Sequence, residues 1–415
     1  MSKLDELIQQ YCPDGVEYVP LSSIGTIKRG NGLQKKDFVK AGIGCIHYGQ
    51  IYTKFGLFTN KTLTYVDKEL ADHLLHIEKG DLVIACTSEN VEDVCKAVAW
   101  LGDDSIVTGG HSCVLHHNQN PKYIAYFFQT ESFQRQKRKY AYGTKVIDIK
   151  PDSIGKIEIP LPPLPVQEEI VRILDAFTEL QAELQAELQK RKQQYNYYLD
   201  NLLNFKNINR GGYQAEVRWM KMSEVFEIRN GYTPSKAKKE FWEGGTIPWF
   251  RMEDIRQNGR ILSDSILHIT PKGVKGKGLF KANSFILATT ATIGEHALII
   301  ADSLANQQFT NLSIRKSLEN ELSVKYVYYY FFVIDEWCKA NTNVSNFASV
   351  DMSKFYNLLI PIPSIAEQQR IVAILDRFDT LTTDLTQGLP AEIEKRRQQY
   401  EYYRDKLLTF KRKGA

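Results

Sequence analysis

The chain has 415 residues, of which 43% are apolar and 25% are charged, a composition typical of a soluble protein with two or three domains. No run of 18 apolar residues occurs and the N-terminus is too polar for a signal peptide, so membrane-spanning and secreted classes are not expected. The net charge of +4 permits nucleic-acid binding without arguing for it. The six cysteines form no CxxC pair, and we expect reduced thiols in a cytoplasmic protein.

The first 160 residues predict a module of short strands and loops with a few helices. Leu82–Thr87 is an apolar run after a turn signal, which predicts a buried strand. Tyr123–Phe128 is rich in aromatic residues and predicts a helix. The prolines from Pro160 to Pro165 cannot continue a strand ladder or a helix interior, so we expect them to mark a joint.

A long helix is predicted next, from Val166 to Phe205. The stretch contains no Pro or Gly across 40 residues, and its apolar residues keep close to a seven-residue pattern: Ile170, Leu174, Phe177, Leu184, Leu188, Tyr195 and Leu202. At 1.5 Å per residue such a helix would be roughly 60 Å long. Within it, Ala182–Gln185 is repeated at once as Ala186–Gln189, a tandem AELQ unit.

The rest of the chain repeats the first part. Val16–Gly30 matches Val217–Gly231 at an offset of 201 residues, and the same offset carries the proline exit and the start of the helix onto Ile360–Phe378. The ends of the unit agree while its middle diverges, which indicates a duplicated module with a shared frame. The second long helix differs from the first, because Gly388-Leu389-Pro390 should break or kink it.

These elements predict an α+β protein. Two similar mixed α/β domains would be joined by two long antiparallel helices, with pseudo-two-fold symmetry. The expected boundaries are residues 1–160 for the first domain, 161–210 for the central helix, 211–361 for the second domain and 362–415 for the C-terminal helix. Two reading heads related in this way have a natural partner in duplex DNA.

Two segments carry a resemblance to a known family: IPLPPLPVQEEIVRILDAF and IPIPSIAEQQRIVAILDRF, followed by KRKQQYNYYLDNLL and KRRQQYEYYRDKLL. They resemble the specificity subunit of type I restriction–modification systems, over essentially the whole chain. The resemblance implies two target-recognition domains that each read one half of a bipartite DNA sequence. It implies helices that set the spacer and receive two methyltransferase subunits, with restriction/translocase subunits outside. S-adenosylmethionine, ATP and Mg²⁺ would act in those partners, and this chain would have no catalytic residue, cofactor or metal.

Catalytic signatures are absent or poor in the sequence itself. There is no GxxxxGK[ST] loop, no GxGxxG after a strand and no HExxH. Asn120–Tyr123 lacks the second proline of a methyltransferase motif and reads as a turn before a helix. Asp148 and Asp351 read as loop or helix-cap residues, and no histidine has a partner at metal-ligand spacing. The alternatives are an unusual methyltransferase or nuclease acting alone, and a protein-binding scaffold.

DNA is expected to be read from polar loops, because planar side chains there can reach base edges while Lys and Arg contact phosphates. The candidates in the first domain are Arg29, Asn31, Lys35, Lys36, Tyr48, Gln50, Tyr52, Lys54, Ser88, Asn90, Thr144 and Lys145. Those in the second are Arg229, Asn230, Tyr232, Thr233, Arg251, Glu253, Thr290, Thr292, Asn306, Gln307, Gln308, Asn343, Ser345 and Asn346. The competing explanations are ordinary solvation and an internal ion pair of Arg251 with Asp254.

Two features of the long helices leave alternatives. The tyrosines at 195–198 and 400–403 are expected to pack helix against helix rather than to stack on bases. The basic triplets at 190–192 and 395–397 either contact phosphates of the spacer DNA or lie in solvent beside the helical seam.

Overall fold

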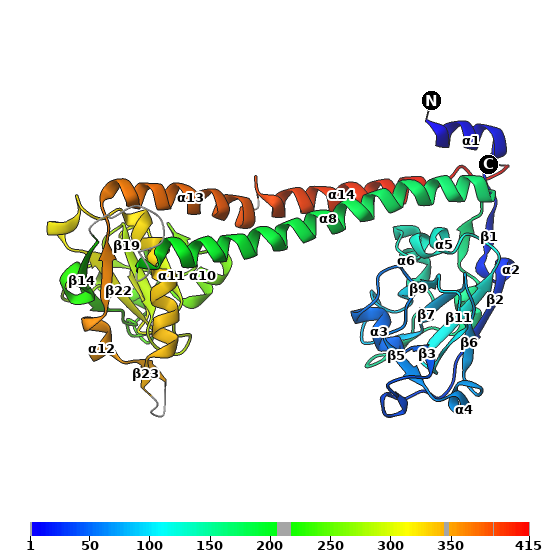
Figure 1. The fold of residues 1–415 in the computed structure, drawn as a ribbon, viewed down its shortest axis with the longest axis horizontal. Coiled ribbons are helices and arrows are strands. Elements are labelled where there is room, and N and C mark those ends of the chain that lie inside the picture. The colour runs from blue at the N-terminus through cyan, green and yellow to red at the C-terminus, as the bar shows by residue number, and fades with distance from the viewer. Residues whose placement is uncertain (1, 206–216, 344–347, 385, 415) are drawn as a thin grey trace. The chain divides into compact units, whose positions relative to one another are not determined.

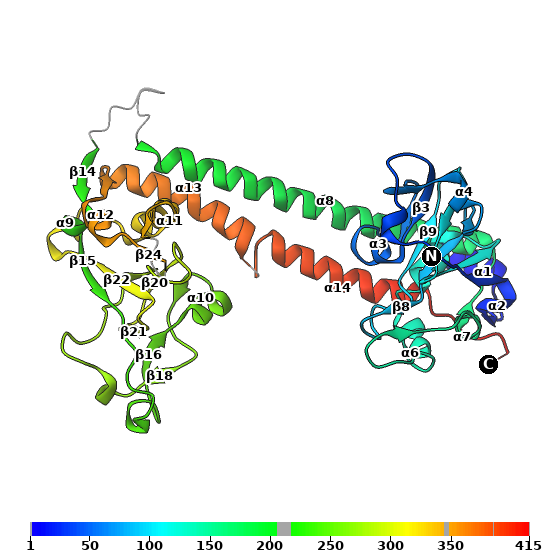
Figure 2. The same ribbon diagram turned by 90° about the horizontal axis from the view of Figure 1, so that it is seen from below.

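The computed structural model describes residues 2–205, 217–343, 348–384 and 386–414. The chain forms two compact units, residues 1–186 with 392–415 and residues 187–391. Each unit combines a sheet-containing domain, one part of the long helix α8 (Leu164–Leu203) and one C-terminal helix (Figures 1 and 2). That helix is α14 (Leu389–Leu407) in the first unit and α13 (Ile365–Thr383) in the second.

The main sheet of each domain has five strands in the same order. In the first domain the order is β2-β11-β7-β9-β4, with the bounds β2 (Gly25–Arg29), β4 (Phe58–Thr59), β7 (Leu82–Ala85), β9 (Ala97–Trp100) and β11 (Ser112–His117). In the second it is β15-β22-β19-β20-β17, with the bounds β15 (Phe226–Asn230), β17 (Ile261–Leu262), β19 (Ser284–Ala288), β20 (His296–Ile299) and β22 (Phe309–Ile314). In both sheets only the last pair is parallel, which confirms the duplicated frame.

A smaller sheet in each domain also follows a shared plan. The first domain has the order β5-β3-β10-β6, formed by β5 (Thr64–Val66), β3 (Ile43–Ile46), β10 (Ile106–Thr108) and β6 (Leu75–Ile77). The second has β18-β16-β21, formed by β18 (His268–Ile269), β16 (Ile247–Phe250) and β21 (Leu304–Ala305). The pairs β3–β10 and β16–β21 are both parallel. Strand β6 extends this sheet in the first domain, which fits the divergence in the middle of the repeat.

An aromatic-rich helix packs on one face of each main sheet. The predicted aromatic helix at Tyr123–Phe128 is confirmed as α5 (Pro121–Phe127), which packs on β7 and β9. Its counterpart in the second domain is α11 (Val324–Ala340), which packs on β19 and β20. The Asn120 side chain caps α5 by accepting from two backbone N–H groups, so the reading of Asn120–Tyr123 as a turn before a helix is confirmed. The other α-helices of the described residues are α1 (Lys3–Tyr11), α2 (Leu21–Ile24), α3 (Tyr48–Thr53), α4 (Lys68–Ala71), α6 (Glu131–Arg138), α7 (Pro151–Gly155), α9 (Met222–Val225), α10 (Met252–Asn258) and α12 (Met352–Asn357).

The proline-containing segment at the end of each domain forms a strand that pairs with a strand near the start of the same domain. β13 (Glu158–Pro160) pairs with β1 (Tyr18–Pro20), and β25 (Leu359–Ile362) pairs with β14 (Arg218–Lys221). The prediction that these prolines lie outside a strand ladder is therefore wrong for Pro160. A pair of strands tolerates proline because its missing N–H can face away from the partner. α8 begins at Leu164, so Pro165 occupies the first helical turn, where no N–H is needed.

The long helices agree with the sequence pattern. α8 is continuous over 40 residues, whereas α13 ends at Thr383 and α14 begins at Leu389, which confirms the predicted break. In the first unit the Phe177 ring lies 5.6 Å from that of Tyr403, and in the second the Phe378 ring lies 5.1 Å from that of Tyr198. The predicted packing is confirmed for four tyrosines: Tyr195, Tyr198, Tyr400 and Tyr403.

Tyr197 and Tyr402 do not follow that prediction. They are 64% and 61% exposed, because they lie one or two positions from the seam and point away from it. In the basic triplets, Arg191 donates to Glu187 at 2.6 Å and Arg396 to Glu392 at 2.7 Å. These pairs within one helix favour the reading of the triplets as solvent-facing residues beside the seam.

The cysteines differ from expectation at one place. Cys86, just after β7, and Cys113 on β11 are joined by a disulfide with a Cα–Cα distance of 6.2 Å. The prediction of reduced thiols is wrong for this pair, because two residues far apart in sequence become neighbours through the β7–β11 pairing. The other four cysteines are free and buried: Cys12, Cys45, Cys95 and Cys338. Among the described residues, no helix combines the length and apolarity needed to span a membrane.

Substitution of Phe285 tests whether this residue belongs to the core of the second domain. Its side chain is fully buried on β19 and stacks on Phe331 of α11 with ring centroids 4.7 Å apart. Phe285→Ala should lower the free energy of unfolding by about 3–5 kcal/mol, through lost burial and the cavity left behind. Thermal unfolding measures this, with Ile300→Ala as the control because Ile300 is 46% exposed. Equal losses for the two variants would contradict the assignment of Phe285 to the core.

Candidate nucleic-acid interface

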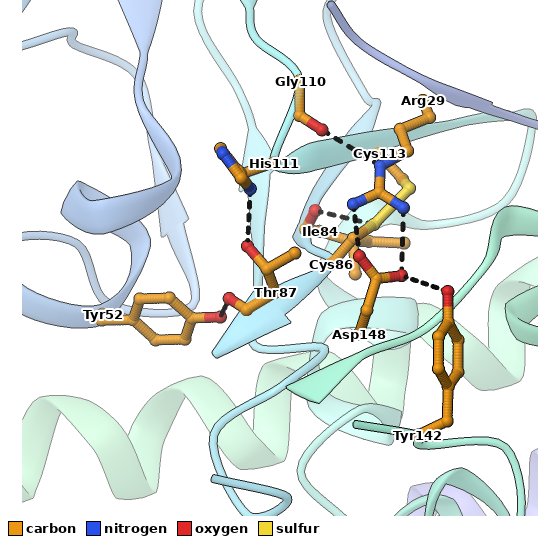
Figure 3. The surroundings of a disulfide bond; sticks show 10 residues. All are labelled: Arg29, Tyr52, Ile84, Cys86, Thr87, Gly110, His111, Cys113, Tyr142 and Asp148. Atoms are coloured by element: carbon orange, nitrogen blue, oxygen red, sulfur yellow. Dashed lines mark hydrogen bonds and ion pairs between the residues drawn. A yellow bond between two sulfur atoms is a disulfide. The ribbon is translucent and has the colours of Figure 1, made fainter. Parts of the chain in front are cut away.

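In the first domain, four of the predicted polar segments meet at one edge of the main sheet. β2 and β7 both run antiparallel to β11, so both end where β11 begins. Helix α3 reaches this edge, since the Tyr52 hydroxyl donates to the Thr87 carbonyl oxygen at 2.6 Å (Figure 3). The segment around β12 (Ile147–Asp148) reaches it too, by pairing with β8 (Thr87–Ser88). We call this surface the first reading edge.

The best-defined contact at the first reading edge is an ion pair. Arg29 donates to both carboxylate oxygens of Asp148, at 3.0 and 2.6 Å, and to the Gly110 carbonyl oxygen at 3.0 Å. The Tyr142 hydroxyl donates to the same carboxylate at 3.2 Å (Figure 3). Hydrogen bonding to Asp148 raises the pKa of Arg29. The donors of Arg29 are thus used inside the domain.

Asp148 was predicted to be a loop or helix-cap residue, and this prediction is wrong, since Asp148 lies in a strand and pairs with an arginine 119 residues away. The same prediction is confirmed for Asp351, whose side chain caps α12 by accepting from the N–H groups of Ser353 and Lys354.

A row of rings lies beside this ion pair. The Tyr48 ring lies 4.6 Å from His47 and 4.7 Å from His111, and His47 also contacts Phe38. The His111 ring nitrogen Nδ1 lies 3.0 Å from the Thr87 hydroxyl. Burial, with the charges of Lys35 and His111, lowers the pKa of His47. A partly buried row of rings of this kind offers flat surfaces next to the polar groups.

The other candidates of the first domain fall into two groups. Gln50 and Asn90 are tied internally, because Gln50 bonds the backbone of His47 and the Thr64 hydroxyl, and Asn90 bonds Asp93. Ser88 is half-buried in β8. Six candidates are exposed: Asn31, Lys35, Lys36, Lys54, Thr144 and Lys145. These six are the most available for an external ligand.

The second domain assembles an edge of the same design, which we call the second reading edge. β15 and β19 end where β22 begins, and the turn Asn306–Gln308 closes the gap between β21 and β22. The Thr233 hydroxyl donates to Gln307, and the Asn306 backbone N–H donates to the Phe250 carbonyl oxygen at 3.0 Å. Thr290 forms a bridge with Ser349 at the start of β24 (Ser349–Val350). The sequence-predicted segments therefore converge here as well.

Several candidates of the second domain are engaged internally. Arg229 donates to the carbonyl oxygens of Gly278 and Leu279, and Tyr232 bonds the backbone of Gly273 and Lys275. Asn306 and Gln308 bond each other, and Asn230 accepts from the Thr310 hydroxyl at 3.1 Å.

The Arg251 side chain pairs with Glu253 at 2.7 Å, so the ion pair considered as an alternative to DNA contact forms with Glu253 and not with Asp254. Asp254 instead accepts from the Arg251 backbone N–H at 2.7 Å. Among the described candidates of the second domain, the Arg251 Nε and the Thr292 hydroxyl are buried without a hydrogen-bond partner. Asn343 lies in β23 (Thr342–Asn343), and Ser345 and Asn346 lie outside the described residues.

Beneath each reading edge a pair of side chains connects the same two strands, but the residues of the pair differ between the domains. Cys86 and Cys113 form a disulfide in the first domain, and Thr289 and Thr310 occupy the corresponding strand positions in the second, with their hydroxyls 2.9 Å apart. Each pair links the strand that ends at the edge to the strand that begins there. The frame is thus common, whereas the side chains above it differ.

Sequence reasoning did not include Asp148 or His111 among the binding candidates. His111 follows the pair Gly109-Gly110 directly before a strand, a turn signal that could have drawn attention to it. Asp148 was considered only as a loop or helix-cap residue, because its partner Arg29 lies in a distant strand and no local signal connects the two. Within the described ranges, no group of three His, Cys, Asp or Glu side chains is arranged to hold a metal ion.

The family profile described as the type I restriction modification DNA specificity domain matches residues 13–193 and again residues 214–395. The chain belongs to this family.

Curated relatives of this specificity-family chain carry matching names. The type I restriction enzyme EcoprrI specificity subunit of Escherichia coli is 54% identical over 204 residues, or 48% of this chain and 51% of the relative. The EcoR124I/EcoR124II specificity subunit, also of Escherichia coli, is 43% identical over 269 residues, or 61% of this chain and 63% of the relative. The chain thus spans between about half and two thirds of the length of these relatives.

Solved structures share the fold of the specificity-family chain over nearly its whole length. A structure concerned with complex assembly and conformational transition of the type I R-M system has a TM-score of 0.64 at 17% identity, covering 95% of this chain and 97% of that one. The HsdS subunit from Thermoanaerobacter tengcongensis has a TM-score of 0.55 at 18% identity, covering 96% and 97%. At these identities the likeness concerns the fold.

Proposed function

We propose that this chain is the DNA-specificity subunit of a type I restriction–modification enzyme. Each domain reads one half of a bipartite duplex target through its reading edge. The observation that carries the proposal is that both domains gather the predicted polar segments at the same edge of the same sheet, while the residues there differ. A common frame with different side chains suits two readers of different half-sites.

The proposed division of labour follows the sequence-predicted boundaries. Residues 1–160 and 211–361 are the recognition domains, residues 161–210 measure the spacer, and residues 362–415 form the second helical segment. The helices receive two methyltransferase subunits, and restriction/translocase subunits join the complex outside them. S-adenosylmethionine, ATP and Mg²⁺ are bound by those partners, so this chain recognises DNA without catalysing a reaction. The complex works in the cytoplasm.

Within the reading edges, we propose different roles for tied and exposed residues. Asn31, Lys35, Lys36, Lys54, Thr144 and Lys145 contact DNA from the first edge. Arg29, whose donors are taken up by Asp148 and Gly110, shapes the edge instead. In the second domain the exposed candidates are Asn230, Glu253, Gln307 and Asn343, and Arg229 and Tyr232 hold neighbouring loops.

The test is binding by the chain reconstituted with its methyltransferase subunits. A library of random duplexes should yield one bipartite sequence, and the affinity should fall steeply with salt. Turnover of DNA by the purified chain alone, with Mg²⁺ and labelled S-adenosylmethionine, would instead favour an enzyme. Complete absence of a DNA footprint in the complex would favour a scaffold.

Lys35 and Lys36 supply a quantitative prediction. Both are exposed beside the first reading edge, and a lysine on a phosphate releases about one counterion from duplex DNA. Lys36→Ala should reduce the slope of log affinity against log salt by about one, and the double variant with Lys35→Ala by about two, with the recognised sequence unchanged. Lys79→Ala is the control, because Lys79 precedes β7 at the opposite end of that strand. An unaltered slope for the double variant would exclude both lysines from the interface.

A further inference from the structure

Each domain is held on its long helix by one carboxylate with two donors. In the first unit Asp175 on α8 accepts from the Lys122 ammonium at 2.6 Å and from the Tyr126 hydroxyl at 2.7 Å. Both donors lie on α5, four residues apart and therefore on one helical face. We call this group of three residues the first clamp.

The second unit contains the same arrangement. Asp376 on α13 accepts from the Lys325 ammonium at 3.0 Å and from the Tyr329 hydroxyl at 2.5 Å. Both donors lie on α11, again four residues apart. This second clamp repeats the first in residue types and spacing, although both donors bind one oxygen of Asp376 and separate oxygens of Asp175.

Further hydrogen bonds near each clamp connect the same domain to the start of the same helix. The Tyr123 hydroxyl donates to the Pro160 carbonyl oxygen at 2.8 Å, and Tyr326 donates to Pro361 at 3.1 Å. The buried Gln167 amide bridges the Pro162 carbonyl oxygen and the Asn120 backbone N–H at the start of α8. Gln368 does the same in the second unit, between Pro363 and Ser323. Because each domain contacts its helix at several separate points, the domain has little freedom to rotate about the helix axis or to tilt along it.

The clamp carboxylates differ from these neighbours in exposure. The tyrosines Tyr126 and Tyr329 are buried with the core, whereas the Asp175 and Asp376 side chains are 22% and 40% exposed. Burial raises the pKa of both tyrosines, so they act as hydrogen-bond donors at neutral pH. A half-exposed carboxylate adds little apolar burial, so its two charge-assisted bonds serve orientation more than core stability.

We propose that Asp175 and Asp376 are positioning residues for target recognition. Asp175 holds the first recognition domain at a fixed angle on α8, and Asp376 holds the second on α13. Each thereby determines how strictly the separation of the two half-sites is measured. This inference rests on the proposed function and adds to it a residue-level cause of spacer selectivity. Neither carboxylate contacts DNA.

A small rotation of a domain on its helix is enough to change the spacer length that the domain accepts. A domain of this size is about 35–40 Å across. A rotation of about 5° at the helix would move its far edge by about 3 Å, close to the rise of one base pair, about 3.4 Å per strand. Loss of a clamp should therefore allow neighbouring spacer lengths to be accepted.

The experiment uses the complete complex with its methyltransferase subunits and duplexes that hold both half-sites with spacers up to two base pairs shorter or longer. We expect the unaltered complex to prefer one spacer, and Asp175→Ala to reduce the preference over adjacent spacers about tenfold. Asp175→Asn, which keeps an acceptor for Tyr126, should give an intermediate result. The bases selected in each half-site should not change.

Two further variants make the result decisive. Glu179→Gln removes the same charge from an exposed position one turn along α8, and it should keep the full spacer preference. Tyr126→Phe deletes only the hydroxyl and retains the packed ring, so it tests the clamp if Asp175→Ala folds poorly. An unchanged spacer preference in folded Asp175→Ala or Tyr126→Phe complexes would overturn the positioning role. If the unaltered complex selected no bipartite sequence, the proposed function itself would fail.

The two clamps should not be equal. The Lys122 ammonium also lies 4.1 Å from the centre of the Phe58 ring, and Asp175 is less exposed than Asp376. We therefore expect Asp376→Ala to relax the spacer preference less than Asp175→Ala does, in the same assay.

Discussion

Deletion of Ala186–Gln189 is expected to shorten the recognised spacer by about two base pairs while both half-sites stay the same. These residues form one AELQ unit inside the continuous helix α8. Removing four residues shortens a helix by about 6 Å and turns it by roughly 40° relative to its start. The turn is small because four residues are close to one helical turn, so the helical faces keep their partners. Along DNA, about 6 Å corresponds to nearly two base-pair steps.

The measurement is a map of methylated adenines in a host that carries the complete system with the altered chain. Insertion of a third AELQ unit should lengthen the spacer by the same amount. Deletion of Ala186 and Glu187 alone is the matched control, since two residues rotate the helix by about 200° and should abolish methylation. An unchanged spacer in the four-residue deletion would leave α8 as a tether without a measuring role.

Replacement of residues 217–350 by the corresponding segment of another family member is expected to change one half of the target completely. The second domain has its own core and its own reading edge, and its exit strand β25 pairs with β14 at its entry. A substituted module that keeps this entry and exit should therefore fold on the same helices. The first half-site and the spacer should remain as they were.

Methylation maps of the exchanged chain test this expectation directly. The control is the reciprocal exchange of residues 16–160, which should alter the other half only. A change in both halves, or in neither, would contradict independent reading by the two domains.

The architecture could be predicted from the sequence to a large extent. The absence of Pro and Gly and the seven-residue pattern predicted α8, and Gly388-Leu389-Pro390 predicted the break before α14. Self-similarity at one offset predicted two domains of one design, which the matching strand orders confirm. These features depend on local periodicity or on comparison of the chain with itself, and both are visible in one dimension.

The availability of polar residues at the reading edges could not be predicted from the sequence, because it depends on contacts between distant strands. Arg29 looked like a free donor in the sequence, but the pairing of β12 with β8 brings Asp148 to it across 119 residues. The disulfide between Cys86 and Cys113 likewise depends on the register of β7 and β11.

The two clamps likewise could not be predicted from the sequence. Lys122, Tyr126 and Asp175 carry no motif, and they become one unit when α5 packs beside α8. Helix periodicity and duplication are properties of neighbouring or matching residues, so the two-domain architecture and the long helices could be predicted from the sequence alone. Partner choice among side chains depends on strand register and helix packing over long separations, so the structure decided which groups face a ligand and which hold the domains in place.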